Sequence, residues 1–379
     1  MDKPLKKILL VNAVLTNNGD AAITLALYNR LVESGFEVTI ATHHFNKIKE
    51  NYPGLVLISD VGSGFFLRKL PFLKKHVKPV LYALKGKFRS SQAVIGVPGG
   101  YMNSYYDFSQ LLKMFVHAAS KNKLVGVYAN SFGPFSKKDL LALEHSSGVF
   151  SALMARDERS MELLRNTKLN PGTFFKSNDA AFLLPQIRGV HKEKRVAISV
   201  REWKKDKRSM KAYVKLVSGI SHYLLERGYA IEFLSTCQGI KDYHNDAKVA
   251  EMIAAQLTYS DKSLVHVDKE YYTLDELRTK LTEYDFVVGT RLHMCLLALK
   301  SGVPAFNISY EFKGKEAYSY LGFGEFSVDF NEKEEHAIHF LSQFLTRKED
   351  VRSQIPKLME KQLLDAEIGF SKFVELISK

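Results

Sequence analysis

The chain has 379 residues, of which 46% are hydrophobic and 25% are charged, and this ordinary globular composition excludes a disordered, collagen-like or coiled-coil protein. Its two cysteines, Cys237 and Cys295, stand in neither a Cys-x-x-Cys nor a Cys/His ligand spacing, which argues against a disulfide framework and a cysteine-based structural metal site. The formal net charge is +13, the length predicts two domains, and no stretch approaches the roughly 18 consecutive apolar residues of a membrane-spanning helix.

The N-terminal residues 1–15 combine lysines with a short apolar run. Asn12 interrupts that run, no small-residue cleavage site follows it, and the chain continues into a turn that contains glycine. We therefore interpret this stretch as a first buried strand and not as a signal peptide, and we expect a cytoplasmic protein.

In the first half of the chain, short β-branched runs alternate with amphipathic stretches, a pattern typical of parallel α/β units. The predicted strands lie near residues 7–14, 36–41, 55–58, 93–97, 124–130 and 151–155, with helices between them. One such helix, over residues 21–34, ends at Gly35, because glycine tolerates the left-handed conformation found at helix C-termini.

The pattern changes near residues 185–195, where Pro185, Gly189 and a charged run indicate a linker. A second set of units follows, with strands near residues 196–200, 231–235, 264–267, 286–288 and 305–308 and helices near 210–226, 242–257, 274–281 and 294–301. We therefore predict an α/β fold with two Rossmann-like domains, residues 1–187 and 188–330, facing across a cleft. Residues 331–379 are expected to form C-terminal helices that pack back across the first domain.

The excess positive charge lies in the first half, where residues 1–200 hold 28 Lys and Arg against 14 Asp and Glu. Its densest part, residues 65–89, has eight basic residues and no acidic one, interleaved with Leu, Phe and Val. An anionic membrane surface attracts such a segment by about 1 kcal/mol per nearby cation, but a solvated basic face explains it equally well. We expect no nucleic-acid partner, because no helix-turn-helix, zinc-finger or RNP-like pattern is present.

Ligands of open α/β sheets collect at the carboxyl ends of the strands. In the first half the candidate residues at such positions are Asn18, Gly19, Asp20, Gly99, Gly100, Ser131 and Arg156. Glycines allow close backbone approach, a helix N-terminus favours an anion, and a guanidinium can hold carboxylate or phosphate. The alternatives are that the glycines form tight turns, that Asp20 caps a helix, and that Arg156 pairs at the surface with Asp157 or Glu158.

In the second half, Arg291 and His293 directly follow a predicted buried strand, where a helix begins. Histidine can move protons near neutral pH, and arginine beside it can fix an anionic substrate, so we expect both to be functional. Lys313 follows the next strand, where an ammonium could meet a second anionic group, although an isolated lysine is more often a surface charge.

Seven short motifs then occur in one order, spread over nearly the whole chain. They are Asn18-Gly19-Asp20, Pro98-Gly99-Gly100, Ser131-Phe132-Gly133-Pro134, Ala155-Arg156-Asp157-Glu158-Arg159-Ser160, Asn178-Asp179-Ala180-Ala181-Phe182, Gly289-Thr290-Arg291-Leu292-His293 and Tyr310-Glu311-Phe312-Lys313. In this order and spacing the chain resembles the polysaccharide pyruvyl transferase family.

The resemblance implies a glycosyltransferase-B type fold and transfer of a pyruvyl group from phosphoenolpyruvate to a sugar, usually as a cyclic ketal. The acceptor would be a surface polysaccharide, such as an exopolysaccharide or capsule, or its lipid-linked precursor at the inner face of the membrane. The implied catalytic residues are His293, Arg291 and Arg156, and the implied donor-binding residues are Arg156, Arg291, Leu292, His293 and Lys313. Expected at the acceptor side or cleft are Asn18, Gly19, Asp20, Gly99, Gly100, Ser131 and Asp179.

We expect no obligatory metal or other cofactor, since arginine and lysine can balance the leaving phosphate. Asp20 and Asp179 could coordinate a metal or orient the sugar hydroxyls, but a helix cap and a turn explain them equally well. Two residues depart from the family pattern: Tyr101 replaces a usual third glycine, and Met294 replaces a small residue that would shape the pocket wall. The main alternative is a glycosyltransferase of the same fold that uses a nucleotide-sugar donor, and a non-catalytic protein that binds nucleic acid is a weaker one.

Overall fold

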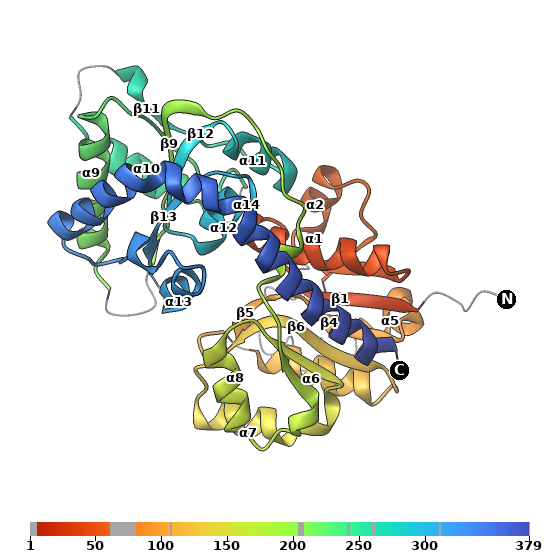
Figure 1. Cartoon of the computed structure of the whole chain (residues 1–379). Coiled ribbons are helices and arrows are strands. Elements are labelled where there is room, and N and C mark those ends of the chain that lie inside the picture. The colour runs from red at the N-terminus through yellow and green to blue at the C-terminus, as the bar shows by residue number, and fades with distance from the viewer. Residues whose placement is uncertain are drawn as a thin grey trace. The chain divides into compact units, whose positions relative to one another are not determined.

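The computed structural model of the chain describes residues 6–60, 81–106, 108–203, 208–240, 243–258, 262–310 and 312–378 (Figure 1). The chain divides into two units. The first comprises residues 1–16, 20–183 and 362–379, and the second comprises residues 17–19 and 184–361. Each unit is built on its own sheet of parallel strands, as the alternating pattern predicts.

Within those described ranges, the first unit holds an eight-stranded sheet of order β3-β2-β1-β4-β6-β7-β8, in which β5 pairs with β6. The strands are β1 (Lys7–Ala13), β2 (Glu37–Thr42), β3 (Leu57–Ser59), β4 (Ala93–Gly96), β5 (Gly99–Met102), β6 (Leu124–Phe132), β7 (Ala152–Ala155) and β8 (Phe174–Lys176). The helices are α1 (Asn18–Glu33), α2 (Phe45–Asn51), α5 (Gly86–Ser90), α6 (Ser109–Ala119), α7 (Lys137–His145) and α8 (Glu158–Arg165).

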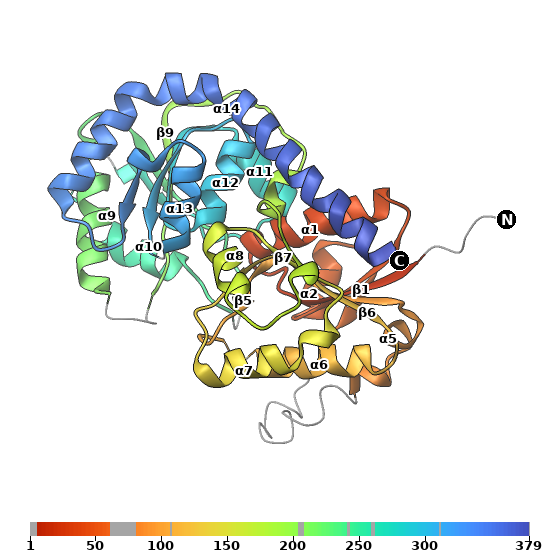
Figure 2. The ribbon, with the colours of Figure 1, turned by 60° about the horizontal axis from the view of Figure 1, so that its bottom comes forward.

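The two faces of strand β6 show why this sheet is covered on both sides. Val125 and Val127 belong to the core beneath α6, whose Phe115 is fully buried. Side chains alternate along a strand, so Tyr128 faces the other way, and its ring meets Phe373 at 4.9 Å between centroids. Figures 1 and 2 accordingly show α6 on one side of this sheet and the C-terminal end of α14 (Glu334–Ser378) on the other.

The second unit, in the part of the chain that is described, holds a six-stranded sheet of order β11-β10-β9-β12-β13-β14. Its strands are β9 (Lys192–Ser199), β10 (Ala230–Phe233), β11 (Val265–Val267), β12 (Tyr284–Gly289), β13 (Ala305–Ser309) and β14 (Ser327–Asp329). Its other helices are α9 (Met210–Leu225), α10 (Ala247–Ala254), α11 (Leu274–Leu281), α12 (Leu292–Lys300) and α13 (Phe312–Tyr320).

Helix α14 is one continuous helix with Pro356 inside it. Its first part packs in the second unit, where Phe344 meets Phe286 of β12 at 5.5 Å and Phe306 of β13 at 5.8 Å between ring centroids. Residues 362–379 belong to the first unit, in which the Asn178 side chain donates to Gln362 Oε1 at 2.6 Å.

Two predicted loops are shorter than expected. Gly99 and Gly100, predicted to lie in a loop after the fourth strand, form part of β5, because Pro98 cannot extend the β4 ladder and the chain resumes pairing with β6. The predicted linker over residues 185–195 also ends early, since β9 begins at Lys192. The charges there are balanced within the unit, and the Arg195 guanidinium pairs with Glu232 and Glu283.

The basic segment predicted over residues 65–89 falls largely on residues 61–80, which lie outside the described residues. In its described end, Lys85 donates to the Ser59 carbonyl at 2.8 Å and Lys87 pairs with Glu37 at 3.2 Å. Among the described helices, none combines the length and the apolar character needed to cross a membrane.

Candidate active site

The carboxyl ends of the adjacent strands β9 and β12 each carry an arginine. Ser199 of β9 is level with Gly289 of β12 in the parallel register. Arg201 and Arg291 follow these two residues at the same spacing. Two arginines therefore follow neighbouring strands at the same level, at the edge where parallel sheets bind their ligands.

Arg291 occupies the N-cap position of α12 and is held by a buried carboxylate. Its Nε and Nη2 atoms donate to Asp246 at 2.5 and 2.9 Å. Burial alone would lower the pKa of this guanidinium, but the charge and hydrogen bonds of Asp246 hold the pKa well above its usual value. The Arg291 side chain is thus fixed in place, and most of its charge is already balanced.

His293, in the first turn of α12, lies against Gly19 of the first βα turn. A Cβ atom on Gly19 would lie 3.0 Å from His293 Cβ and 3.2 Å from His293 Nδ1. Asn18 holds this turn in the second unit, because its backbone N–H donates to the Thr236 carbonyl at 2.8 Å and its side chain to the Tyr272 carbonyl at 2.9 Å. The structure therefore brings Asn18 and Gly19, expected at the acceptor side, together with His293.

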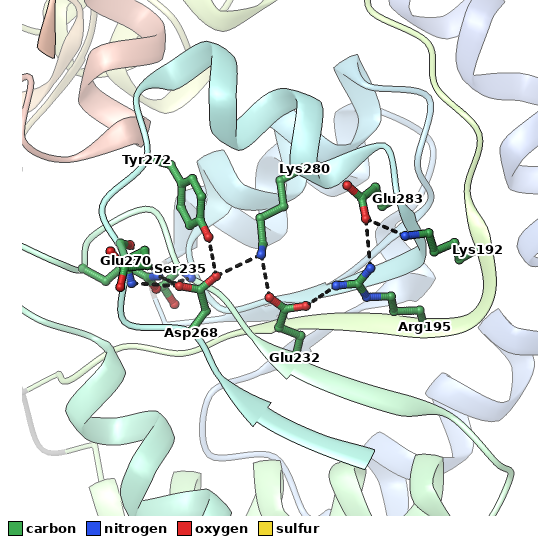
Figure 3. A network of polar contacts seen from close by, with 10 residues as sticks. Lys192, Arg195, Glu232, Ser235, Asp268, Glu270, Tyr272, Lys280 and Glu283 are labelled. Atoms are coloured by element: carbon green, nitrogen blue, oxygen red, sulfur yellow. Dashed lines mark hydrogen bonds and ion pairs between the residues drawn. The ribbon is translucent and has the colours of Figure 1, made fainter. Parts of the chain in front are cut away.

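The loop that accepts the Asn18 hydrogen bond is itself anchored by a chain of charges (Figure 3). Lys280 of α11 bridges Glu232 at 2.7 Å and Asp268 at 3.0 Å. Asp268 in turn accepts from the Tyr272 hydroxyl at 2.7 Å. Because these side chains lie on different strands and helices, the network fixes the loop after β11 relative to the rest of the sheet.

Glu232 is the central carboxylate of this network. Burial would raise its pKa, but hydrogen bonds from Lys280 and Arg195 outweigh burial and lower the pKa to about 2. The same contacts raise the pKa of Lys280 above its ordinary value, against the effect of burial. Glu232 and Lys280 are therefore both charged at neutral pH.

In the first unit, Arg156, Ser131 and Asp179 form a second cluster. Arg156 Nε donates to Ser131 Oγ at 2.9 Å, and Arg156 Nη1 donates to Asp179 Oδ2 at 2.7 Å. Ser131 Oγ donates onward to Asp157 at 2.6 Å, and the other oxygen of Asp157 caps α8. The surface ion pair considered for Arg156 is therefore wrong: Asp179 is its direct partner, and Glu158 pairs with Arg165 and Lys176 instead.

The remaining predicted residues belong to both units. Asp20 lies in the first turn of α1 in the first unit, and Leu292 opens α12 in the second. Lys313 lies in α13, but its side chain is outside the described residues. Arg156 and Arg291 belong to different units, so their convergence on one substrate stays a prediction.

The structure accounts for both departures from the family pattern. A Cβ on Gly96 would lie 2.5 Å from the Tyr101 hydroxyl, and one on Gly99 would lie 2.9 Å from the Tyr101 ring. The Tyr101 hydroxyl donates to the Val97 carbonyl at 2.7 Å, and burial raises its pKa. Tyr101 thus fills the space that these glycines leave open. Met294 is fully buried, so it belongs to the core and not to an exposed pocket wall.

Two residues of the second-unit site, Arg201 and Asp246, are not among those predicted from the sequence. Arg201 follows β9 as Arg291 follows β12, so the rule that identified Arg291 could have identified it. Asp246 has no such signal, because it lies 45 positions before Arg291 in the chain. Among the described residues, no group of three or more His, Cys, Asp and Glu side chains is arranged to hold a metal ion.

Comparisons with known proteins place this geometry in a wider context. Residues 17–311 match the family described as polysaccharide pyruvyl transferase. The amylovoran biosynthesis protein AmsJ of Erwinia amylovora is 27% identical over 339 residues, which cover 83% of this chain and 79% of AmsJ.

Solved structures agree with the fold. A putative UDP-N-acetylglucosamine 2-epimerase from Listeria monocytogenes has a TM-score of 0.61 at 12% identity, covering 93% of this chain and 91% of its own. The Anabaena protein HepE, solved with UDP and glucose, has a TM-score of 0.62 at 10% identity, and the match covers 99% of this chain and 100% of the HepE chain. The predicted α/β fold of the glycosyltransferase-B type is thereby confirmed. Since the family match also covers well over half of its length, the chain belongs to the polysaccharide pyruvyl transferase family.

Proposed function

We propose that this protein transfers the pyruvyl group of phosphoenolpyruvate to two hydroxyls of one sugar, forming a pyruvate ketal in a surface polysaccharide or its lipid-linked precursor. Membership of the family supports a transferase that acts in polysaccharide biosynthesis, and the relative AmsJ is itself named for the biosynthesis of amylovoran. One structural observation carries the proposal: two arginines and a histidine follow the level carboxyl ends of the adjacent strands β9 and β12.

This combination suits the chemistry of the donor. A proton adds to the methylene carbon of phosphoenolpyruvate, and a sugar hydroxyl attacks the carbon that carries the phosphate. The bond from that carbon to the phosphate oxygen breaks, and a second hydroxyl of the sugar closes the ketal. Of the two hydroxyl protons, one balances the proton added to the methylene and the other leaves with the phosphate. Arginines can bind the donor anion, and His293 can transfer one of these protons.

The roles of the residues follow from their positions. Arg291, fixed by Asp246, orients the donor at the start of α12, where His293 stands in the first turn. Arg156, held by Asp179 in the first unit, contributes to the same reaction in this proposal. Asn18 and Gly19 hold the βα turn against His293 and so limit where its imidazole can point.

The test is to incubate the purified protein with phosphoenolpyruvate and a panel of sugar acceptors, measuring released phosphate and product mass. His293→Ala is expected to abolish transfer and to retain donor affinity, because the histidine moves protons while the arginines hold the anion. The exposed His336, in the first turn of α14, gives a matched control, His336→Ala, that should keep full activity. Near-normal turnover of His293→Ala would refute this mechanism.

The alternative donor, a nucleotide sugar, finds less support in the second unit. A cavity of about 680 Å³ lies beside β11, and its lining includes Glu251, Asp268, Glu270, Lys269 and Lys280. Both lysines are already paired, Lys269 with Glu251 and Lys280 with Asp268. Those described side chains leave this cavity without a spare cation for a diphosphate. Binding assays that compare phosphoenolpyruvate with nucleotide sugars separate the two donors.

The lipid-linked form of the acceptor motivates a further part of the proposal. The basic segment of residues 65–89 would attract the protein to the anionic inner face of the membrane, where such acceptors reside. The test compares the wild type with a variant that lacks the segment. It measures their binding to vesicles with and without anionic lipid, and their turnover of a lipid-linked and of a water-soluble acceptor. Unchanged vesicle binding and unchanged turnover would remove the membrane from the proposal.

A further inference from the structure

Arg201 reaches across the carboxyl end of β12. It follows β9, and its guanidinium carbon lies 4.0 Å from the centroid of the Tyr310 ring, which follows β13. In the sheet β12 lies between β9 and β13. The Arg201 side chain therefore passes over the end of the intervening strand, close to the point where α12 begins.

Aromatic rings hold the Arg201 guanidinium in this position. The centroid of the Trp203 ring lies 4.9 Å from the guanidinium carbon of Arg201. The same ring centroid lies 4.7 Å from that of Tyr310. Contacts of this kind stabilise an arginine without neutralising it. These ring contacts leave the N–H donors of the guanidinium available to bind a ligand.

Arg201 differs from Arg156 and Arg291, the strand-end arginines identified from the sequence, in how its charge is balanced. Arg156 pairs with Asp179 and Arg291 pairs with Asp246. Within the described ranges no carboxylate forms an ion pair with Arg201, and its buried Nε atom has no hydrogen-bond partner. A buried donor without a partner is costly, and an anionic ligand would remove that cost.

The start of α12 adds a second attraction for an anion. The helix is nine residues long, and its N-cap residue, Arg291, makes no side-chain capping hydrogen bond. Backbone N–H groups and the helix dipole at such an end favour a phosphate. Arg201, which passes over the same strand end, supplies the cation for it.

We propose that Arg201 and the first turn of α12 form the subsite for the phosphate of the anionic donor. This inference rests on the proposed function, since it names the group that binds one part of its substrate. Arg291 and His293 are then left for the three-carbon part of the donor, where the new bonds form.

Trp203 offers a direct readout, because it is the single tryptophan of the chain. We would titrate phosphoenolpyruvate, inorganic phosphate and pyruvate into the full-length protein, following tryptophan fluorescence and, independently, binding heat. Phosphoenolpyruvate and phosphate are expected to bind and to change the fluorescence, whereas pyruvate, which lacks the phosphate, is expected to bind at least tenfold more weakly.

Arg201→Ala should weaken the binding of both phosphate-bearing probes by at least tenfold, with an unchanged circular dichroism spectrum. Arg201→Lys should fall between this variant and the wild type, because lysine keeps the charge without the fork of donors. Arg227→Ala is the matched control. The guanidinium carbon of Arg227 also lies close to a tyrosine ring, 3.5 Å from the centroid of Tyr223. Arg227 lies between α9 and β10, however, at the amino ends of the strands and not at their carboxyl ends. Arg227→Ala should bind phosphoenolpyruvate and phosphate as tightly as the wild type does.

The outcomes separate this inference from the function on which it rests. If Arg201→Ala binds phosphoenolpyruvate as tightly as the wild type does, the subsite is refuted and the transfer reaction stands. If the wild type binds inorganic phosphate through Arg201 but does not bind phosphoenolpyruvate, the donor is refuted and the subsite stands. Pyruvate binding as tight as that of phosphoenolpyruvate would overturn the assignment of Arg201 to the phosphate.

Discussion

In the proposed donor site, single side chains at the strand ends would divide between them the binding of the anion and its orientation. Arg291 is buried against Asp246, so its main contribution is a fixed geometry. Arg201 is held by ring contacts instead and, in the proposed subsite, its charge is available for the phosphate. An aspartate partner weakens the attraction of an arginine for an anionic substrate, but it prevents the side chain from adopting other rotamers. The proposed site combines one arginine of this kind, Arg291, with one that is held by aromatic rings, Arg201.

The buried pair of Arg291 and Asp246 makes a prediction about stability. Arg291→Ala should lower the free energy of unfolding by about 3–5 kcal/mol, because the Asp246 carboxylate would stay buried without its counter-charge. The double variant Arg291→Ala, Asp246→Ala should recover part of this loss. Urea denaturation of the single and double variants measures both effects. A double variant as unstable as the sum of the two single variants would show that the pair is not coupled.

The contact between Gly19 and His293 predicts opposite effects on activity and stability. In Gly19→Ala the new methyl group would lie 3.0 Å from His293 Cβ, so the imidazole must shift by a few tenths of an ångström. We expect kcat to fall roughly tenfold, while stability stays equal or rises, because alanine is the better helix former in the first turn of α1. Gly86→Ala, where nothing lies within 4 Å, is the control. An unchanged kcat in Gly19→Ala would contradict the contact.

Strands and helices position these side chains through register and through charged networks. The level ends of β9 and β12 place two arginines side by side, and the Lys280 network ties the loop after β11 to the sheet. Through Tyr272 this loop binds Asn18, so the network supports the turn that contacts His293.

Glu232 gives this network a dependence on pH. Its pKa of about 2 in the folded protein lies below the ordinary value of 4.5, so the network contributes its full stability above pH 4.5 and loses it as the pH falls toward 2. The shift corresponds to about 3 kcal/mol. Glu232→Gln should lose roughly this amount at pH 7, and its difference from the wild type should shrink between pH 4.5 and 2.

Urea denaturation across this pH range measures the effect. Glu335→Gln, a change at an exposed position of α14, serves as the control and should follow the wild type at each pH. A difference between Glu232→Gln and the wild type that stays constant from pH 7 to pH 3 would show that the carboxylate is not held by its cationic partners.

Much of the fold could be predicted from the sequence, because periodic apolar runs mark the strands of both sheets. Strands of three or four residues give only a weak periodic signal: β5, β8 and β14 were missed, whereas β3 and β11, which are equally short, were predicted. In the site, Arg291 and His293 were identifiable from their place after a strand. The contacts of Arg291 with Asp246 and of His293 with Gly19 could not be identified in this way, because long-range packing alone brings these residues together.

The whole chain is two units that share one helix, α14, and each unit buries a different stretch of it. Phe373, near the end of this helix, is fully buried and contacts Tyr128 and Gly126 of β6, all within the first unit. The single tryptophan, Trp203, lies in the second unit. Tryptophan fluorescence therefore reports unfolding of the second unit, whereas far-ultraviolet circular dichroism reports both.

Phe373→Ala should destabilise the first unit by about 3–5 kcal/mol, the usual cost of removing a buried aromatic ring, and leave the second unit as it was. We expect the transition measured by circular dichroism to gain an early phase while the transition measured by fluorescence keeps its midpoint. Ile368→Ala, at a position 64% exposed on the same helix, should change neither. If the fluorescence midpoint of Phe373→Ala fell together with the circular dichroism signal, α14 would join the two units into one cooperative structure, and their independent unfolding would be refuted.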